Sequence, residues 1–267
     1  MALIFGLAIV LVLVFGGFVL SGGSMAVILH ALPYEGMIVA GAALGAMVIG
    51  NSMGTLGKIG RGIGKVVFGP RWKARDYTDL LELLHELCQL RRGDFLKLEE
   101  HIEAPHASAL MARYPRLRDE PAVMDMIRDS FRLISMQFDS PMETEMVLDR
   151  RLAKRRKEAL SPVKAMDTMA DALPAIGIIA AVLGVIKTMA VVDQSPKVLG
   201  EMIAGALTGT FLGVFLAYCL VAPISNRLRQ IEEQDGQLLV VIRDVIVAMV
   251  ANHPPNVAVE IGRNSIP

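Results

Sequence analysis

Carboxylate side chains are absent from the two long apolar segments in the second half of this 267-residue chain, residues 172–192 and 202–224. Each segment is long enough to cross the ~30 Å hydrocarbon core of a bilayer as a helix. Their interiors offer hydroxyls, small side chains and one tyrosine, but no acid between Asp171 and Arg227 except in the short connecting loop. If these segments line an ion path, the titrating group is expected to come from another chain.

Cysteine and aromatic residues are also scarce, which argues against a cysteine-based metal site and against a nucleic-acid-binding protein. Cys88 falls in a polar segment and Cys219 in an apolar one, so we expect both thiols to be reduced and to bind no metal. One tryptophan, four tyrosines and a formal net charge of +0 leave neither a stacking surface nor a general basic bias for nucleic acid. We expect no nucleic-acid partner and no cofactor.

Signatures of catalysis are missing as well. The stretch GRGIGK at residues 60–65 has the wrong spacing for a Walker A loop and follows no predicted strand. His101 and His106 flank Pro105, which spoils the helical spacing that a pair of metal ligands would need. The sequence therefore predicts that the protein is not an enzyme.

Apolar residues, in contrast, are abundant and arranged in blocks. They make up 53% of the chain, and the mean hydropathy is +0.48, which is typical of an integral membrane protein. The first block has no basic region before it and is too long for the core of a signal peptide, so it predicts a retained transmembrane helix. Four spans in two pairs are predicted: Ala2–Leu20 and Gly36–Ile49 within residues 1–50, and two more within 171–227, with short connections at Ser21–Glu35 and Asp193–Glu201.

Basic residues predict the orientation of these spans. They cluster after the second span, before the third and after the fourth, whereas the two short connections carry almost none. Residues 51–170 and 228–267 are therefore expected in the cytoplasm, together with the N-terminus. The clustered residues are Lys58, Arg61, Lys65, Arg71, Lys73 and Arg75, then Arg150, Arg151, Lys154, Arg155, Arg156, Lys157 and Lys164, and finally Arg227 and Arg229.

The segment between the two pairs has helical periodicity. Leucines recur at helical spacing in DYTDLLELLHELCQL, with acidic residues on the other face. The predicted fold is an all-α membrane protein with four transmembrane helices and a helical cytoplasmic domain inserted between the second and third. Within that domain, helices are expected at residues 76–90, 91–102, 123–136 and 142–152, separated by breaks at Pro105, Pro115 and Pro121.

A few polar residues within the spans are candidates for an ion path. Thr210 and Tyr218 are eight residues apart, on nearly the same face of the fourth span. Intramembrane polar groups usually face a bundle interior or a water path, but a threonine can also bond its own i−4 carbonyl. We favour the latter for Thr208 and leave both open for Thr210. Lys187 is close enough to the outer end of its span to reach the interface.

Two prolines and one charged cluster have alternative interpretations. Pro174 and Pro223 each remove a backbone donor, and they either mark a helix start and a helix end or form a hinge. Charged residues around residues 91–100, including Arg91 and Glu99, form either a solvated helix face or a surface that steers a charged partner.

Several segments, in order along the chain, resemble the flagellar stator subunits of the MotA/TolQ/ExbB proton-channel family. The resemblance runs nearly end to end. It is carried by VFGGFVLSGGS (14–24), IVAGAALGAMVIGN (38–51), FLKLEEHIE (95–103), LPAIGIIAAVLGVI (173–186), ALTGTFLGVFLAYCLVAPI (206–224) and PPNVAVEIGR (254–263).

The resemblance implies a rotary machine. Five such subunits would surround a dimer of a MotB-like partner, which is anchored to peptidoglycan and supplies an essential aspartate. The resemblance places Thr210 opposite that aspartate and gives Pro174 and Pro223 a role in torque. It also matches Arg91, or its neighbour Arg92, and Glu99 to a charged pair that meets the rotor protein FliG.

The nature of the ion depends on one further position. Sodium-driven relatives resembling PomA have a threonine where this chain has Ala181, and an alanine offers no hydroxyl to a hard cation. The expected ion is therefore the proton. The alternatives are a sodium-driven PomA-like stator, a TolQ/ExbB-like energiser of a periplasmic partner, and a scaffold that conducts nothing.

Overall fold

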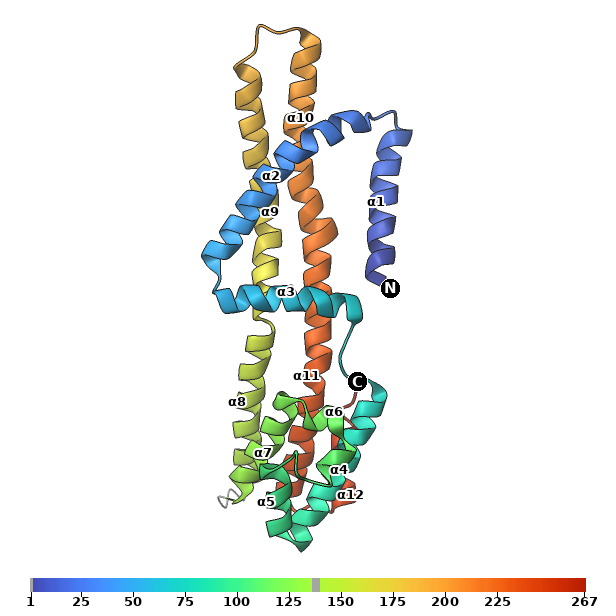
Figure 1. Cartoon of the computed structure of the whole chain (residues 1–267), viewed down its shortest axis with the longest axis vertical. Coiled ribbons are helices and arrows are strands. Elements are labelled where there is room, and N and C mark those ends of the chain that lie inside the picture. The colour runs from blue at the N-terminus through green and yellow to red at the C-terminus, as the bar shows by residue number, and fades with distance from the viewer. Residues whose placement is uncertain (1, 136–139) are drawn as a thin grey trace. The chain divides into compact units, whose positions relative to one another are not determined.

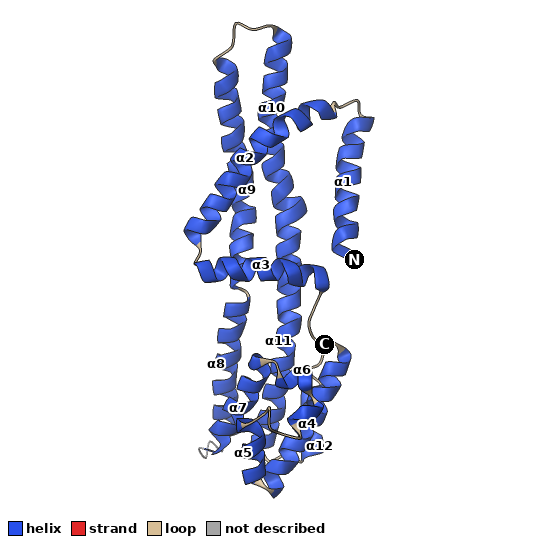
Figure 2. Cartoon of the chain, in the orientation of Figure 1, coloured by secondary structure: helices blue, strands red, loops and turns tan. Residues whose placement is uncertain are grey.

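The computed structural model describes residues 2–135 and 140–267, and within these ranges the chain is helical and has no strand (Figure 2). It forms two compact units. The span unit contains the chain up to Gly69 and Leu160–Gln230; the polar unit contains Pro70–Ala159 and Ile231–Pro267. Helix α11, Ala222–Val250, contributes residues to both.

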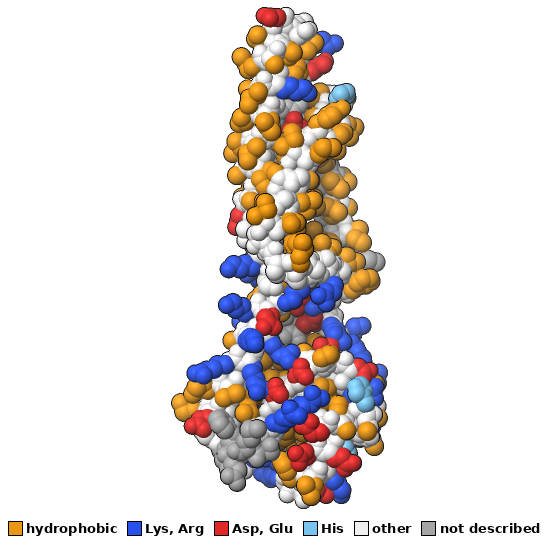
Figure 3. Space-filling model, turned by 60° about the vertical axis from the view of Figure 1, so that its left-hand side comes forward, with side chains coloured by type: hydrophobic (Ala, Val, Ile, Leu, Met, Phe, Trp, Pro, Cys, Tyr) orange, Lys and Arg blue, Asp and Glu red, His pale blue; other side chains and the backbone are white. Residues whose placement is uncertain are grey.

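Four helical stretches of the span unit are long and apolar enough to cross a membrane, as the sequence predicts (Figure 1). Hydrophobic side chains cover much of their visible surface, whereas Lys, Arg, Asp and Glu are concentrated over the polar unit (Figure 3). The stretches are α1 (Ala2–Leu20), α2 (Met25–Gly50), α9 (Ser161–Met189) and α10 (Pro196–Phe215), the last continuing through a π-helix (Leu216–Val221) into α11.

The second span differs from the prediction. Residues 25–35 were expected in a connection, but α2 already begins at Met25, after Ser24 at its N-cap position. The helix contains Pro33 in its interior, which a membrane helix tolerates because neighbouring groups can satisfy the freed backbone. The predicted connection Ser21–Glu35 is therefore wrong, and Glu35 lies inside a membrane-capable helix. Similarly, α10 begins at Pro196, within the predicted connection Asp193–Glu201.

The division into units also differs from the predicted domain boundaries at residues 50, 170 and 227. Helix α3 (Met53–Phe68) packs on α9 and belongs to the span unit, although it was expected in the cytoplasmic domain 51–170. The start of α9 also belongs to the span unit, because α9 is one uninterrupted helix from Ser161. The C-terminal segment was expected as a separate part, but Ile231–Pro267 packs with residues 70–159.

The polar unit is held by a core of aliphatic side chains. Leu80, Leu83, Leu84 and Leu87 of α4 are fully buried and belong to one cluster with α11 residues such as Ile242. Helices are present near all four ranges predicted from periodicity, but α5 is shorter than the predicted 91–102 because α4 runs on to Gly93. Pro115 and Pro121 begin helices, and the predicted end at Met136 lies outside the described residues. The bounds are α4 Ala74–Gly93, α5 Phe95–Glu103, the 3₁₀ turn η1 Met111–Arg113, α6 Pro115–Arg118, α7 Pro121–Ser135, α8 Pro141–Ala159 and α12 Pro255–Arg263.

Both cysteines are free thiols, as expected. Cys88 is buried in the polar core, and burial raises the pKa of its thiol to about 12. The thiolate is the reactive form of cysteine, so Cys88 stays protonated and acts as a small apolar side chain.

Candidate functional site

Glycines bring α9 and α10 into backbone contact. A Cβ atom on Gly213 would lie 2.6 Å from the carbonyl oxygen of Leu173 and 2.8 Å from Cα of Gly177. A Cβ on Gly177 would in turn lie 3.0 Å from the carbonyl oxygen of Gly209. Small residues permit such close approach between membrane helices, where packing rather than hydrophobic burial drives association. Gly177, Gly209 and Gly213 therefore mark a region where α9 and α10 approach backbone to backbone.

The two threonines of α10 have different partners. The hydroxyl of Thr208 donates to the carbonyl oxygen of Ala204 at 3.0 Å, which is the predicted i−4 bond within its own helix. The hydroxyl of Thr210 donates instead across the hairpin, to the carbonyl oxygen of Gly177 at 3.4 Å. Thr208 is buried and Thr210 is half-buried. The Thr210 hydroxyl thus lies at the contact between α9 and α10, and its side chain is still partly exposed on the isolated chain.

An acidic side chain that the sequence analysis assigned to a loop lies against this hairpin. Glu35 of α2 is half-buried, and a Cβ on Gly209 would lie 2.7 Å from its Oε2 atom and 2.8 Å from Cβ of Ala180. This oxygen is buried and has no hydrogen-bond partner among the described residues. The positive charge of Lys187 also attracts the same carboxylate electrostatically. α2 therefore supplies an acid beside the hairpin that the sequence analysis did not place there, while the expectation that the titrating group of the ion path comes from another chain stays a prediction.

The signal for Glu35 was present in the sequence. The apolar residues before Glu35, from Met25 to Leu32, continue the hydrophobic pattern of the second span toward its N-terminus. Pro33 and Glu35 interrupt that pattern and suggested a loop. An acid inside a membrane-capable helix marks a functional candidate by default, because burying a charge in a bilayer is costly.

Both prolines lie inside helices, so neither marks a helix start or a helix end. Pro174 is in the middle of α9, where it leaves the carbonyl of Ala170 without its usual i+4 donor. Pro223 is the second residue of α11 and directly follows the π-helix Leu216–Val221. Within that segment the bonding is wider: the N–H of Ala222 donates to the carbonyl oxygen of Ala217, five residues back. Such π segments are frequent at functional sites, and they leave the helix locally loosened.

The remaining ion-path candidates line different parts of the hairpin. Ala181 is half-buried and lies one turn beyond Gly177, whose carbonyl accepts from Thr210. Tyr218 lies within the π-helix, and 65% of its surface is exposed on the isolated chain. The predicted common face of Thr210 and Tyr218 stays a prediction, because the π-helix that contains Tyr218 changes the number of residues per turn.

In the polar unit, the arginine and the glutamate predicted to meet a charged partner lie in different environments. Arg91, near the C-terminal end of α4, is half-buried, and its Nη1 donates to the carbonyl oxygen of Met249 at 2.5 Å. The neighbouring Arg92 is exposed and donates to the carbonyl oxygens of Asn252 and His253 at 2.9 and 3.2 Å. Glu99 is exposed on α5. Both arginines therefore bind backbone carbonyls at and just beyond the end of α11.

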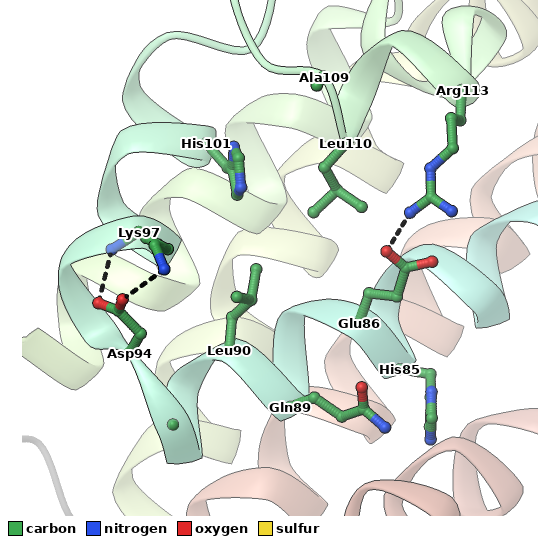
Figure 4. Close-up of a pocket in the computed structure, with 11 residues that line it drawn as sticks. His85, Glu86, Gln89, Leu90, Asp94, Lys97, His101, Ala109, Leu110 and Arg113 are labelled. Atoms are coloured by element: carbon green, nitrogen blue, oxygen red, sulfur yellow. Dashed lines mark hydrogen bonds and ion pairs between the residues drawn. The ribbon is translucent and has the colours of Figure 1, made fainter.

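An open groove runs beside this region, between α4, α5 and the 109–113 segment (Figure 4). Its walls carry both signs of charge around Leu90 and Leu110. An ion pair joins Arg113 to Glu86, and another joins Lys97 to Asp94 at 3.1 Å, so the charges are largely matched within the chain. The groove has no cluster of metal-binding side chains, and none was found elsewhere among the described residues.

Comparisons with known proteins agree with this architecture. The sequence profile of the motility protein A N-terminal region matches residues 4–94, and that of the MotA/TolQ/ExbB proton channel family matches residues 120–238. The chain is 35% identical to chemotaxis protein LafT of Vibrio parahaemolyticus over 262 residues, which covers 98% of this chain and 91% of that protein. It is 32% identical to motility protein A of Escherichia coli over 267 residues, which covers 100% of this chain and 90% of the relative.

Solved structures have the same fold. The MotAB structure from C. jejuni superposes with a TM-score of 0.76 at 17% identity, covering 100% of this chain and 95% of that one. The flagellar MotAB stator complex from Bacillus subtilis gives a TM-score of 0.68 at 20% identity, covering 96% and 91%. Over the described residues, fold and spans together define a multi-pass, all-helical membrane protein. Within that class, the chain belongs to the motility protein A family.

Proposed function

We propose that this chain is the ion-conducting stator subunit of a bacterial flagellar motor and couples inward proton flow to torque. The observation that carries the proposal is the end-to-end relationship to motility proteins, combined with a hairpin that brings Thr210 and Glu35 to one helix junction. In this proposal the spans lie in the inner membrane. The polar unit, inserted between the second and third spans and completed by the C-terminal segment, is cytoplasmic, as are both termini. The chain acts as a channel and motor component, without catalysis.

The proposed assembly is five copies around a dimer of a MotB-like, peptidoglycan-anchored partner that supplies the essential aspartate. The solved neighbours named above are MotAB complexes, which supports a partner of this type. The outward faces of α9 and α10 also support it, since apolar side chains such as Ile179, Val182 and Leu207 are largely exposed on the isolated chain. Partner helices, neighbouring copies and lipid would cover these faces.

In the proposed proton step, the ion neutralises the partner's aspartate near Thr210. A neutral acid can pass apolar wall residues such as Ala181 and Leu212, whereas a charged one at a helix centre costs ~2.5–3.5 kcal/mol on insertion scales. One charge moving through 100 mV supplies ~2.3 kcal/mol, which is of the same size. Protonation can therefore gate one step of the ring. Glu35 offers this chain's own carboxylate next to that path.

The proposed transmission of the step uses the loosened backbone at Pro174 and at the π-helix before Pro223. The step then reaches the rotor protein FliG through charged residues of the polar unit, with Glu99 as the exposed acid and Arg91 or Arg92 as the base. The exposed position of Glu99 and the solvent-facing position of Arg92 support this pairing. The contact of Arg91 with Met249 gives that arginine an additional role inside the unit.

The proposal is tested by swimming speed in cells that use this chain and its partner as their sole stator. A proton-driven stator predicts that a protonophore stops swimming and that removing sodium has no effect. Dependence on sodium would instead establish a PomA-like stator. If deleting the chain left motility intact in such cells, the TolQ/ExbB-like energiser would be the better interpretation.

A matched pair of substitutions tests the ion path. We expect Thr210→Val to reduce torque at least tenfold while the complex still assembles, because the hydroxyl at the helix junction is lost and the volume is kept. Thr208→Val removes a hydroxyl that bonds only its own helix, so swimming should change little. Torque is measured from tethered cells, and assembly from co-purification of the partner. Equal torque in the two variants would remove Thr210 from the ion path.

A further inference from the structure

Helix α3 follows the second span directly, because only Asn51 and Ser52 separate it from α2. It runs crosswise to α9 within the span unit (Figure 1). Its inner face packs closely, since a Cβ on Gly62 would lie 2.8 Å from Cδ2 of Leu228. A helix that lies across a spanning helix, at the end of a span, runs roughly parallel to the membrane surface.

Most side chains of α3 are sorted around its axis into three faces; Phe68 at its C-terminal end, 90% exposed, is an apolar residue on the basic side. Ile59, Gly62 and Val66 form the buried face. At 3.6 residues per turn, the basic residues lie on one flank and three apolar residues lie on the opposite flank. The basic residues are Lys58, Arg61 and Lys65; the apolar ones are Met53, Ile63 and Val67, with exposed fractions of 78%, 48% and 49%.

The charged residues of α3 and of the chain segments next to it in sequence are all basic. No acidic residue occurs from Gly36 to Arg75, a stretch that includes the part of α2 after Glu35, α3 and the connection that follows. Lys58 and Arg61 are exposed. An in-plane helix with an apolar flank and a basic flank matches a bilayer interface, where acyl chains meet headgroups. The complementary partner for the basic flank is an anionic phospholipid.

We propose that α3 lies in the plane of the membrane surface and binds the anionic headgroups of phospholipids through Lys58 and Arg61. Ile63 and Val67 contact the acyl chains on its other flank. The lipid-bound helix braces α11 from the side through the Gly62–Leu228 contact and also packs on α9. This surface is separate from the ion path, so the proposal holds whichever ion the protein conducts.

The first test measures lipid selectivity of the full chain, co-purified with its partner and reconstituted in nanodiscs of equal parts phosphatidylglycerol and phosphatidylcholine. Phosphatidylglycerol retained after mild extraction is counted by native mass spectrometry. We expect enrichment of phosphatidylglycerol that falls with rising salt. The double variant Lys58→Gln/Arg61→Gln should lower the enrichment about fivefold per removed charge.

Matched control variants distinguish the effect of losing these two charges from misfolding and from the loss of a charge elsewhere on the protein. The charge-preserving variant Lys58→Arg/Arg61→Lys should retain the enrichment, and so should Lys197→Gln, which removes an exposed charge from the first turn of α10. If the wild-type protein shows no enrichment, or if Lys197→Gln lowers it as much as the double variant does, the proposal is overturned.

The second test measures depth and distinguishes lipid from a neighbouring copy. Val67→Trp adds an indole to the apolar flank, and dibrominated lipids should quench its added fluorescence. Strong quenching with an intact oligomer supports the proposal. Absence of quenching, or loss of the oligomer in Val67→Trp while phosphatidylglycerol enrichment is unchanged, would show that this flank contacts another copy of the chain and would overturn the lipid assignment.

Discussion

Gly213→Ala is expected to abolish swimming and to lower the stability of the span unit by about 1–3 kcal/mol or more, the range observed for overpacked interiors. The added Cβ would lie 2.6 Å from the carbonyl oxygen of Leu173 and 2.8 Å from Cα of Gly177. Both are backbone atoms, which cannot rotate away, so α9 must shift. The shift also separates Thr210 from the Gly177 carbonyl. Swimming speed and the unfolding temperature of the purified protein measure the two effects.

The matched control is Gly205→Ala on the same helix. A Cβ there would have Ala31 Cβ as its nearest neighbour, at 3.8 Å, which is an ordinary contact. Alanine also favours a helix by about 1 kcal/mol over glycine, so this variant should be as stable as the natural protein or slightly more stable. Similar behaviour of the two variants would mean that close contact at Gly213 is not what holds the hairpin.

Arg91→Ala is expected to destabilise the polar unit by about 1.5–3 kcal/mol, the typical contribution of a hydrogen bond from a charged group. The guanidinium of Arg91 binds the carbonyl oxygen of Met249, next to the end of α11, and that acceptor would be left without it. Unfolding of the full chain, followed by circular dichroism, should show a lower midpoint for the polar unit. Motility should fall as well.

Glu99→Gln separates a rotor contact from this structural role. Glu99 is exposed, so its neutralisation should leave the unfolding midpoint unchanged. If it nevertheless lowers torque, the acid acts on a partner rather than on the fold. Arg91→Lys keeps the charge but loses the forked donor, so it should recover only part of the stability. An unchanged midpoint for Arg91→Ala would contradict the structural role.

The two prolines show what local sequence patterns can and cannot predict. Pro174 and Pro223 were recognised from the sequence as positions that remove a backbone donor, but helix-start and helix-end positions were among the alternatives. The structure places both inside helices and puts a π-helix before Pro223. Local propensity disfavours an interior proline, whereas packing between neighbouring membrane helices compensates for the missing bond. That packing energy depends on contacts distant in sequence, so no local pattern could reveal it.

The sequence by itself determined the helical class and the four spans, because both depend on hydrophobic periodicity along the chain. Tertiary structure alone decided where Glu35 lies, which carbonyls Thr210 and Arg91 bind, and that α3 belongs to the span unit. These facts join residues that are far apart in sequence. They depend on how the helices pack against one another, and patterns of neighbouring residues do not determine that packing.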